Sequence, residues 1–108
     1  MIAYVDSSIL LRRILGQSGA LADWKDLKAP VASALVEVEC LRTIDRLRVR
    51  AGVEDRQVSV WREAVYRLLA EAEVVEITRS VLDRAAQPLP TLLGTLDAIH
   101  LATALIWR

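Results

Sequence analysis

The sequence predicts an α/β domain built around a parallel sheet, with helices covering both faces of the sheet. Three short apolar runs alternate with longer segments whose apolar residues recur every three or four positions. This alternation is typical of parallel strands joined by helices. The 108 residues fit one domain over 1–108, and 54% hydrophobic with 26% charged residues exclude a disordered or collagen-like chain.

The first predicted elements are a strand, a tight turn and a helix. Residues 2–5 form an apolar run with β-branched and aromatic members, which ends sharply at Asp6. Asp6 and the two serines after it suit a helix N-cap and first turn, so we expect a helix over 9–15. Gly16 ends this helix, and one or two further turns are expected over 20–24. Asp6 is therefore expected at the carboxyl tip of the first strand.

Two long helices are predicted in the middle of the chain. A second strand over 29–32 leads to Ser33, which can cap a helix over 34–50 that stops at Gly52. Apolar residues recur at helical spacing over 54–72 and predict the next helix. Together these helices carry a wide apolar face, which indicates either ordinary core packing or a docking surface.

The last third of the chain predicts a strand over 74–77, a helix over 79–86 and a final helix that opens at Gly94 and Thr95. The apolar stretch 92–107 is shorter than the roughly 20 residues that a membrane span requires. The N-terminus has no basic region typical of a signal peptide. We therefore expect a soluble, cytoplasmic protein without membrane association.

Cysteine usage and charge narrow the class of protein further. Cys40 is the only cysteine, so an intrachain disulfide is impossible, and its apolar neighbours indicate a buried core residue. The 14 basic and 14 acidic residues give zero net charge, which argues against a histone-like or polybasic protein that binds phosphate over its whole surface. A local basic face remains compatible with this balance.

Three carboxylates merit attention, and each has a simple structural interpretation. Asp6 can cap the first helix, and Glu39 can form an i,i+3 ion pair with Arg42 worth a few tenths of a kcal/mol. Asp97 lies in the first turn of the last helix, where the helix dipole favours a negative charge. His100 follows one turn later, and we expect it to orient or pack rather than to bind metal.

Taken together, the three acids suggest a metal site. Ligands of open parallel sheets bind beyond the carboxyl ends of the strands. The sequence has no cysteine cluster, no second histidine and no glycine-rich phosphate loop. An all-oxygen ligand set suits Mg²⁺ or Mn²⁺ better than zinc. Such cations commonly serve phosphate chemistry, because they polarise a phosphoryl oxygen and lower the pKa of an attacking water.

Three segments resemble the motifs of a known family. Residues 4–10 resemble the opening of PIN domains, particularly VapC-type toxins. In 33–42 a capping serine is followed six residues later by Glu39, which is similar to the second acidic motif of that family. Residues 93–104, around Asp97, resemble the third and most specific motif. The order and spacing of the motifs match over the whole chain.

The resemblance implies a three-layer α/β/α sandwich and assigns the catalytic, metal-binding acids. Asp6, Glu39 and Asp97 match the first three acids of the family, with Glu37 as the alternative to Glu39. The resemblance implies that these acids bind Mg²⁺ or Mn²⁺. Ser7 or Ser8 matches a hydroxyl residue of the family that lies near the metal. On the Glu39 face of the helix, Arg42 and Arg46 are candidates for phosphate contact, with simple ion pairing as the alternative.

The resemblance also implies an activity and partners. The implied activity is endoribonuclease cleavage of structured RNA such as tRNA or rRNA. The implied partners are a VapB-type antitoxin of a type II toxin–antitoxin system and a second copy of the chain in a homodimer. The apolar face of 34–72 would then receive an antitoxin helix or the second protomer, unless it is core.

One departure from the family pattern leaves an alternative open. The family continues past the third motif to another strand that ends in a fourth acid, whereas this sequence stops at Arg108. A C-terminally truncated, PIN-like domain is therefore expected. The missing acid favours a non-catalytic module that binds a partner protein or RNA, and the three retained acids favour the metal-dependent endoribonuclease.

Overall fold

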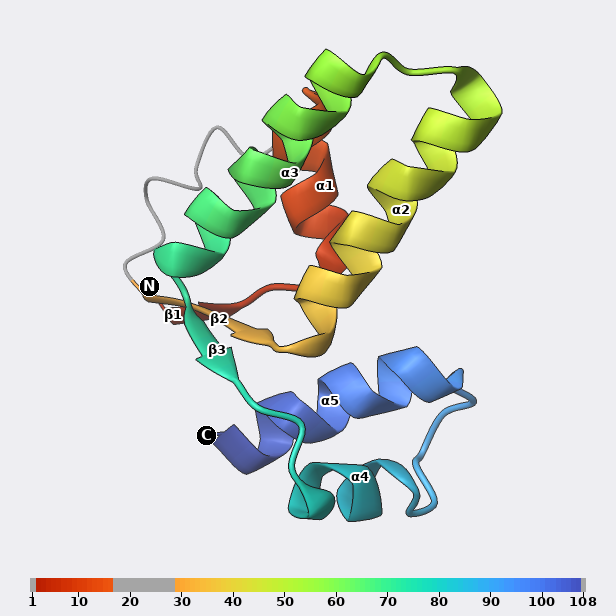
Figure 1. Cartoon of the computed structure of the whole chain (residues 1–108). Coiled ribbons are helices and arrows are strands. Elements are labelled where there is room, and N and C mark those ends of the chain that lie inside the picture. Colours follow the sequence, from red (N-terminus) through yellow and green to blue (C-terminus); the bar gives the residue numbers. More distant parts are fainter. Residues whose placement is uncertain (1, 17–28, 108) are drawn as a thin grey trace.

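Three parallel strands and five helices make up the part of the chain that the computed structural model describes, residues 2–16 and 29–107 (Figure 1). The strands are β1 (Ile2–Tyr4), β2 (Ala29–Ser33) and β3 (Glu73–Val75). The helices are α1 (Ser7–Leu15), α2 (Leu35–Ala51), α3 (Asp55–Ala70), α4 (Arg79–Ala85) and α5 (Thr95–Trp107).

The strands form one sheet in the order β1-β2-β3, with both pairings parallel. Tyr4 is in register with Val31, and Val31 with Glu73. Because parallel strands share one carboxyl edge, the segments that leave β1 and β2 emerge side by side. This edge brings Asp6 and the start of α2 close together.

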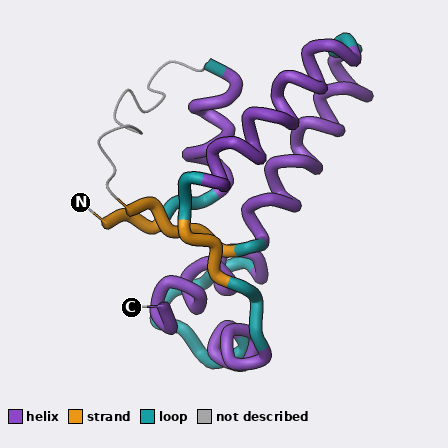
Figure 2. The backbone as a smooth tube through the Cα atoms, turned by 60° about the vertical axis from the view of Figure 1, so that its left-hand side comes forward, coloured by secondary structure: helices purple, strands orange, loops and turns teal. Residues whose placement is uncertain are grey.

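Helices cover the two faces of the sheet in separate groups. Helices α1, α2 and α3 lie on one side, and α4 and α5 lie on the other (Figures 1 and 2). Helices α2 and α3 form an antiparallel hairpin that turns at Gly52, whose φ of 63° is left-handed and suits glycine. The three-layer α/β/α arrangement predicted from the sequence is confirmed for the described residues.

The observed ends of the elements differ slightly from the predicted ones. Ser33 is the last residue of β2 rather than the N-cap of α2, but its hydroxyl still accepts a hydrogen bond from the N–H of Leu35 at 3.1 Å. Strand β3 begins one residue earlier than predicted and ends two residues earlier, at Val75. The turns expected over 20–24 lie outside the described residues.

The main core lies between the sheet and helices α1 to α3. Cys40 is fully buried in this core, as predicted, and Trp61 packs against it while partly buried. Much of the apolar face of the helix hairpin is thus core rather than free surface. The buried members of this core are Val5, Leu10, Ala32, Val36, Cys40, Ile44, Val65 and Leu69.

None of the described helices combines the length and the apolar character needed to cross a bilayer.

Candidate functional site

Asp6 lies where the sequence predicts it, immediately beyond β1, and it is the N-cap of α1. Its Oδ1 accepts hydrogen bonds from the N–H of Ile9 at 3.2 Å and from the hydroxyl of Ser8 at 2.6 Å. The Asp6 side chain is exposed, so it combines a capping role with access to solvent. The structural and functional interpretations of Asp6 are therefore compatible.

Glu39 lies on α2 and contacts the last helix instead of its own neighbour Arg42. Its Oε1 is 2.5 Å from Nε2 of His100, which is on α5. Arg42 pairs with Asp45 at 3.2 Å, so the predicted Glu39–Arg42 ion pair is wrong. The partner of Glu39 is thus the buried imidazole of His100, from the opposite helical layer, and not the exposed guanidinium of Arg42.

The far side of the His100 ring is held by Tyr4. The hydroxyl of Tyr4 is 3.3 Å from Nδ1 of His100, and the two rings meet edge to face with centroids 6.4 Å apart. Burial raises the pKa of the Tyr4 hydroxyl; hydrogen bonding with Thr103 and Ser33 opposes this rise, and the charge of Asp6 adds to it. Tyr4 was not among the residues singled out in the sequence, because an aromatic residue in a short strand has an ordinary packing interpretation.

The charges of Asp6 and Glu39 act on the same buried thiol. Burial, and after it the nearby carboxylates of Glu39 and Asp6, in that order, together raise the pKa of Cys40 to about 12. Cys40 also donates a weak hydrogen bond to the carbonyl of Ser7, with Sγ 3.8 Å from the oxygen. Asp6, beyond β1, and Glu39, on α2, therefore both lie near this buried thiol.

A cleft of about 330 Å³ opens beside these residues. The first turn of α1, one face of α2 and the start of α5 form its walls. The candidates Ser7, Glu39, Arg42 and Arg46 all lie on this cleft, and the last three share one face of α2 as predicted. The remaining lining residues are Leu35, Val38, Thr43 and Leu96.

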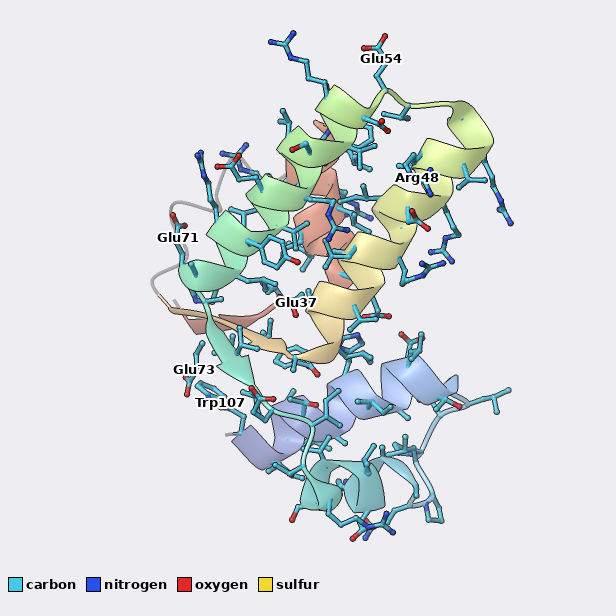
Figure 3. The ribbon with its side chains drawn as sticks, in the orientation of Figure 1. Glu37, Arg48, Glu54, Glu71, Glu73 and Trp107 are labelled. Carbon is cyan, nitrogen blue, oxygen red and sulfur yellow. The ribbon has the colours of Figure 1, made fainter. Side chains whose placement is uncertain are left out.

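Glu37, the alternative to Glu39, does not line the cleft. Residues two positions apart on an α-helix are separated by about 200°, so Glu37 and Glu39 project from nearly opposite sides of α2. Figure 3 shows Glu37 directed toward the α3 side of α2 rather than toward α5. The contacts of α2 therefore favour Glu39 over Glu37.

Asp97 lies in the first turn of α5 and is exposed. It stands next to Leu96, which lines the cleft, and one turn before His100. Over residues 2–16 and 29–107, no group of three His, Cys, Asp or Glu side chains is close enough together to hold a metal ion. The three-acid site thus stays a prediction. Glu39 lines the cleft, and Asp6 and Asp97 are the sequence neighbours of its lining residues Ser7 and Leu96.

The parallel sheet with helices on both faces is consistent with the fold of a PIN domain. The family model described as PIN domain matches residues 3–106, and the chain belongs to this family. Among its relatives is "Ribonuclease VapC46" of Mycobacterium tuberculosis (strain ATCC 25618 / H37Rv), which is 36% identical over 104 residues, covering 94% of this chain and 72% of the relative. "Ribonuclease VapC35" of Mycobacterium tuberculosis (strain CDC 1551 / Oshkosh) is 40% identical over 106 residues, with 94% and 71% covered.

Proposed function

We propose that this chain is a metal-dependent endoribonuclease, the toxin of a type II toxin–antitoxin pair, that cleaves structured RNA such as tRNA or rRNA. Membership of the PIN family and relatives named ribonucleases support the class of reaction. The observation that carries the proposal is that the segments of Asp6 and Glu39 meet beside a cleft, because Cys40, next to Glu39, contacts the carbonyl of Ser7, next to Asp6. Carboxylates gathered at this position suit a divalent cation.

Asp6, Glu39 and Asp97 are the residues proposed to hold Mg²⁺ or Mn²⁺. Ser8 fixes one oxygen of Asp6, and His100 fixes one oxygen of Glu39. When bound, the cation would polarise a phosphoryl oxygen and lower the pKa of an attacking water. The carboxylates supply the hard oxygen ligands that such a cation prefers over nitrogen or sulfur.

The same cleft offers a means to bind the substrate. Arg42 and Arg46 line it, and guanidinium groups bind phosphate oxygens with paired N–H donors. Arginines beside the carboxylates would hold the RNA backbone with its scissile phosphate near Asp6 and Glu39. Ser7, which also lines the cleft, is a candidate for contact with the phosphate.

The proposed partners follow from the relatives. The name VapC supports a VapB-type antitoxin as cognate inhibitor, and we propose a homodimer as the assembled form. An RNA substrate and a single cysteine suit the cytoplasm. Exposed apolar residues on the α2–α3 hairpin, including Val49, Val60 and Tyr66, are available to such partners.

A second candidate function is a non-catalytic PIN module that binds a partner protein or RNA. It is favoured by the finding that no three potential ligands lie together in the described part of the chain. Calorimetric titration with Mn²⁺ separates the two functions. Binding that is lost in Asp6→Asn supports the nuclease, and no binding by the wild-type chain supports the module.

Cleavage assays test the nuclease directly. We expect the wild-type chain to cleave RNA with Mg²⁺ or Mn²⁺, and we expect EDTA to abolish this cleavage. We expect Asp6→Asn and Asp97→Asn to lose cleavage activity. Asp83→Asn is the matched control, since Asp83 is an exposed carboxylate on α4 that pairs with Arg79. Unchanged cleavage by both Asp6→Asn and Asp97→Asn would contradict the assignment.

A further inference from the structure

A continuous line of polar contacts joins three elements behind the cleft. Tyr4 on β1 contacts Nδ1 of His100 on α5, and Nε2 of the same ring contacts Oε1 of Glu39 on α2. Tyr4 and His100 are 96 positions apart, and His100 and Glu39 are 61 positions apart. Such a line exists only in the folded domain, and it ties the two helical layers together at the candidate site.

The chemistry of the groups gives this line a direction. An ionised carboxylate has only acceptors, so Nε2 of His100 carries the hydrogen that is donated to Glu39. In a neutral ring Nδ1 is then an acceptor, and the hydroxyl of Tyr4 donates to it. The raised pKa of Tyr4 is consistent with a hydroxyl that keeps its proton. For an ionised Glu39 and a neutral His100, the expected direction of donation is therefore from Tyr4 through His100 to Glu39.

Burial makes this arrangement rigid. The side chain of His100 is 9% exposed and that of Glu39 is 19% exposed, so water has little access to replace their contact. Both ring nitrogens have partners, and the edge-to-face contact with Tyr4 restricts the ring further. Glu39 is held by one oxygen only, because its Oε2 makes no hydrogen bond or ion pair with any described residue.

We propose that His100 is a positioning residue that fixes Oε1 of Glu39 and thereby leaves Oε2 in place for the divalent cation. This inference rests on the proposed metal-dependent function and adds Tyr4 as the residue that orients the ring. Hydrogen-bond partners of metal ligands set the orientation of those ligands, and their loss typically weakens metal binding about 10- to 100-fold. His100 acts through Glu39 and does not itself touch the cation.

The first test measures Mn²⁺ binding by calorimetry, without RNA. We expect His100→Leu to bind Mn²⁺ about 10- to 100-fold more weakly than the wild-type chain. His100→Gln carries an amide that can donate to Oε1, so we expect it to recover most of the affinity. Tyr4→Phe keeps the contact between His100 and Glu39 and should have the smaller effect.

A matched control separates positioning from a loss of stability. Val81 on α4 is 1% exposed and lies outside the line of polar contacts, so Val81→Ala should lower the melting temperature and leave the Mn²⁺ affinity unchanged. If His100→Leu does not fold, the comparison of His100→Gln with the wild type and the spectrum described next still decide the question.

The second test reads the ring directly by ¹⁵N NMR of the metal-free chain. His100 is the only histidine in the sequence, so its ring signals are unambiguous. We expect Nε2 of His100 to be protonated and Nδ1 to be unprotonated, and the opposite tautomer would overturn the proposal. It would also be overturned by a folded His100→Leu that binds Mn²⁺ as tightly as the wild type.

The proposed function fails in a different way. If the wild-type chain binds Mn²⁺ and Asp6→Asn weakens binding, the metal site stands, and wild-type affinity in His100→Leu removes only the positioning role. If the wild-type chain binds no Mn²⁺, the metal-dependent function itself is contradicted, and the positioning role of His100 is contradicted as well.

Discussion

Arg42 forms an ion pair with Asp45 and not with Glu39, although both carboxylates are three residues away on α2. Nη1 of Arg42 lies 3.2 Å from Oδ2 of Asp45, while Glu39 contacts His100. Asp45 also accepts from Arg48, with Nη2 at 3.0 Å from Oδ1. Arg42 is thus anchored along the helix while it still lines the cleft, and most of its five N–H donors remain for a phosphate.

We predict that Arg42→Ala weakens the binding of a single-stranded oligoribonucleotide. It should also reduce the slope of the logarithm of the binding constant against the logarithm of the salt concentration by about one, the value for one lost phosphate contact. Arg48→Ala is the matched control, because Arg48 shares the partner Asp45 but does not line the cleft. Figure 3 shows Arg48 farther along α2, toward the α2–α3 turn. Fluorescence anisotropy at several salt concentrations, with EDTA to prevent cleavage, measures both variants. Equal losses in both would contradict a phosphate role for Arg42.

The pH dependence of stability should report on Asp45. Hydrogen bonding from Arg48 is the main cause that lowers the pKa of Asp45 below its usual 3.8, and Arg42 adds to it. Because the folded-state pKa is depressed, the stabilisation is present above pH 3.8 and is lost as the pH falls below that value. Asp45→Asn should therefore be less stable than the wild type at pH 7, and the difference should shrink toward zero in acid and in high salt. Urea unfolding across this pH range measures it.

Two substitutions of Asp6 should separate its structural role from its chemical role. Asparagine caps a helix about as well as aspartate, whereas alanine costs about 1 kcal/mol. We therefore predict near wild-type stability for Asp6→Asn, a loss of about 1 kcal/mol for Asp6→Ala, and no RNA cleavage by either. Thr78→Ala is the matched control, since Thr78 caps α4 by accepting from the N–H of Val81 at 3.3 Å. This variant should lose similar stability and keep its activity, as chemical denaturation and cleavage assays can establish.

Cys40 should be unreactive in the folded chain. Its side chain is fully buried and its pKa is raised to about 12, so almost no thiolate is present at pH 8. A disulfide reagent such as DTNB should label it slowly in buffer and rapidly in urea. Rapid labelling of the folded chain would mean that the packing between α2 and Ser7 opens easily, contrary to the buried position described above.

Local sequence signals predicted the helices well, and the strand ends less well. Gly16 and Gly52 end α1 and α2 with left-handed backbone, as their positions indicated. Strand β3 covers Glu73–Val75 because its partner fixes it: Ser33 ends β2 and is in register with Val75. The residues after Val75 look like a strand in isolation but have no partner along β2. Pairing, and not propensity, sets these limits.

The composition of the candidate site was predictable, but its contacts were not. Helical periodicity placed Glu39, Arg42 and Arg46 on one face, and the cleft confirms that they share it. Periodicity also suggested the wrong partner for Glu39, because it identifies neighbours on one helix and carries no information about another layer. The contact with His100 depends on how α5 packs against the sheet. That packing follows from the whole fold.

The long sequence separation within the polar line has a consequence for protein synthesis. Glu39 leaves the ribosome well before His100, and Tyr4 leaves it earlier still, so a growing chain that lacks α5 cannot make either contact. The strands β1 and β2 and the α2–α3 hairpin are available much sooner. A nascent polypeptide that already carries Tyr4 and Glu39 therefore lacks the imidazole of His100, and both contacts form only after α5 has been translated.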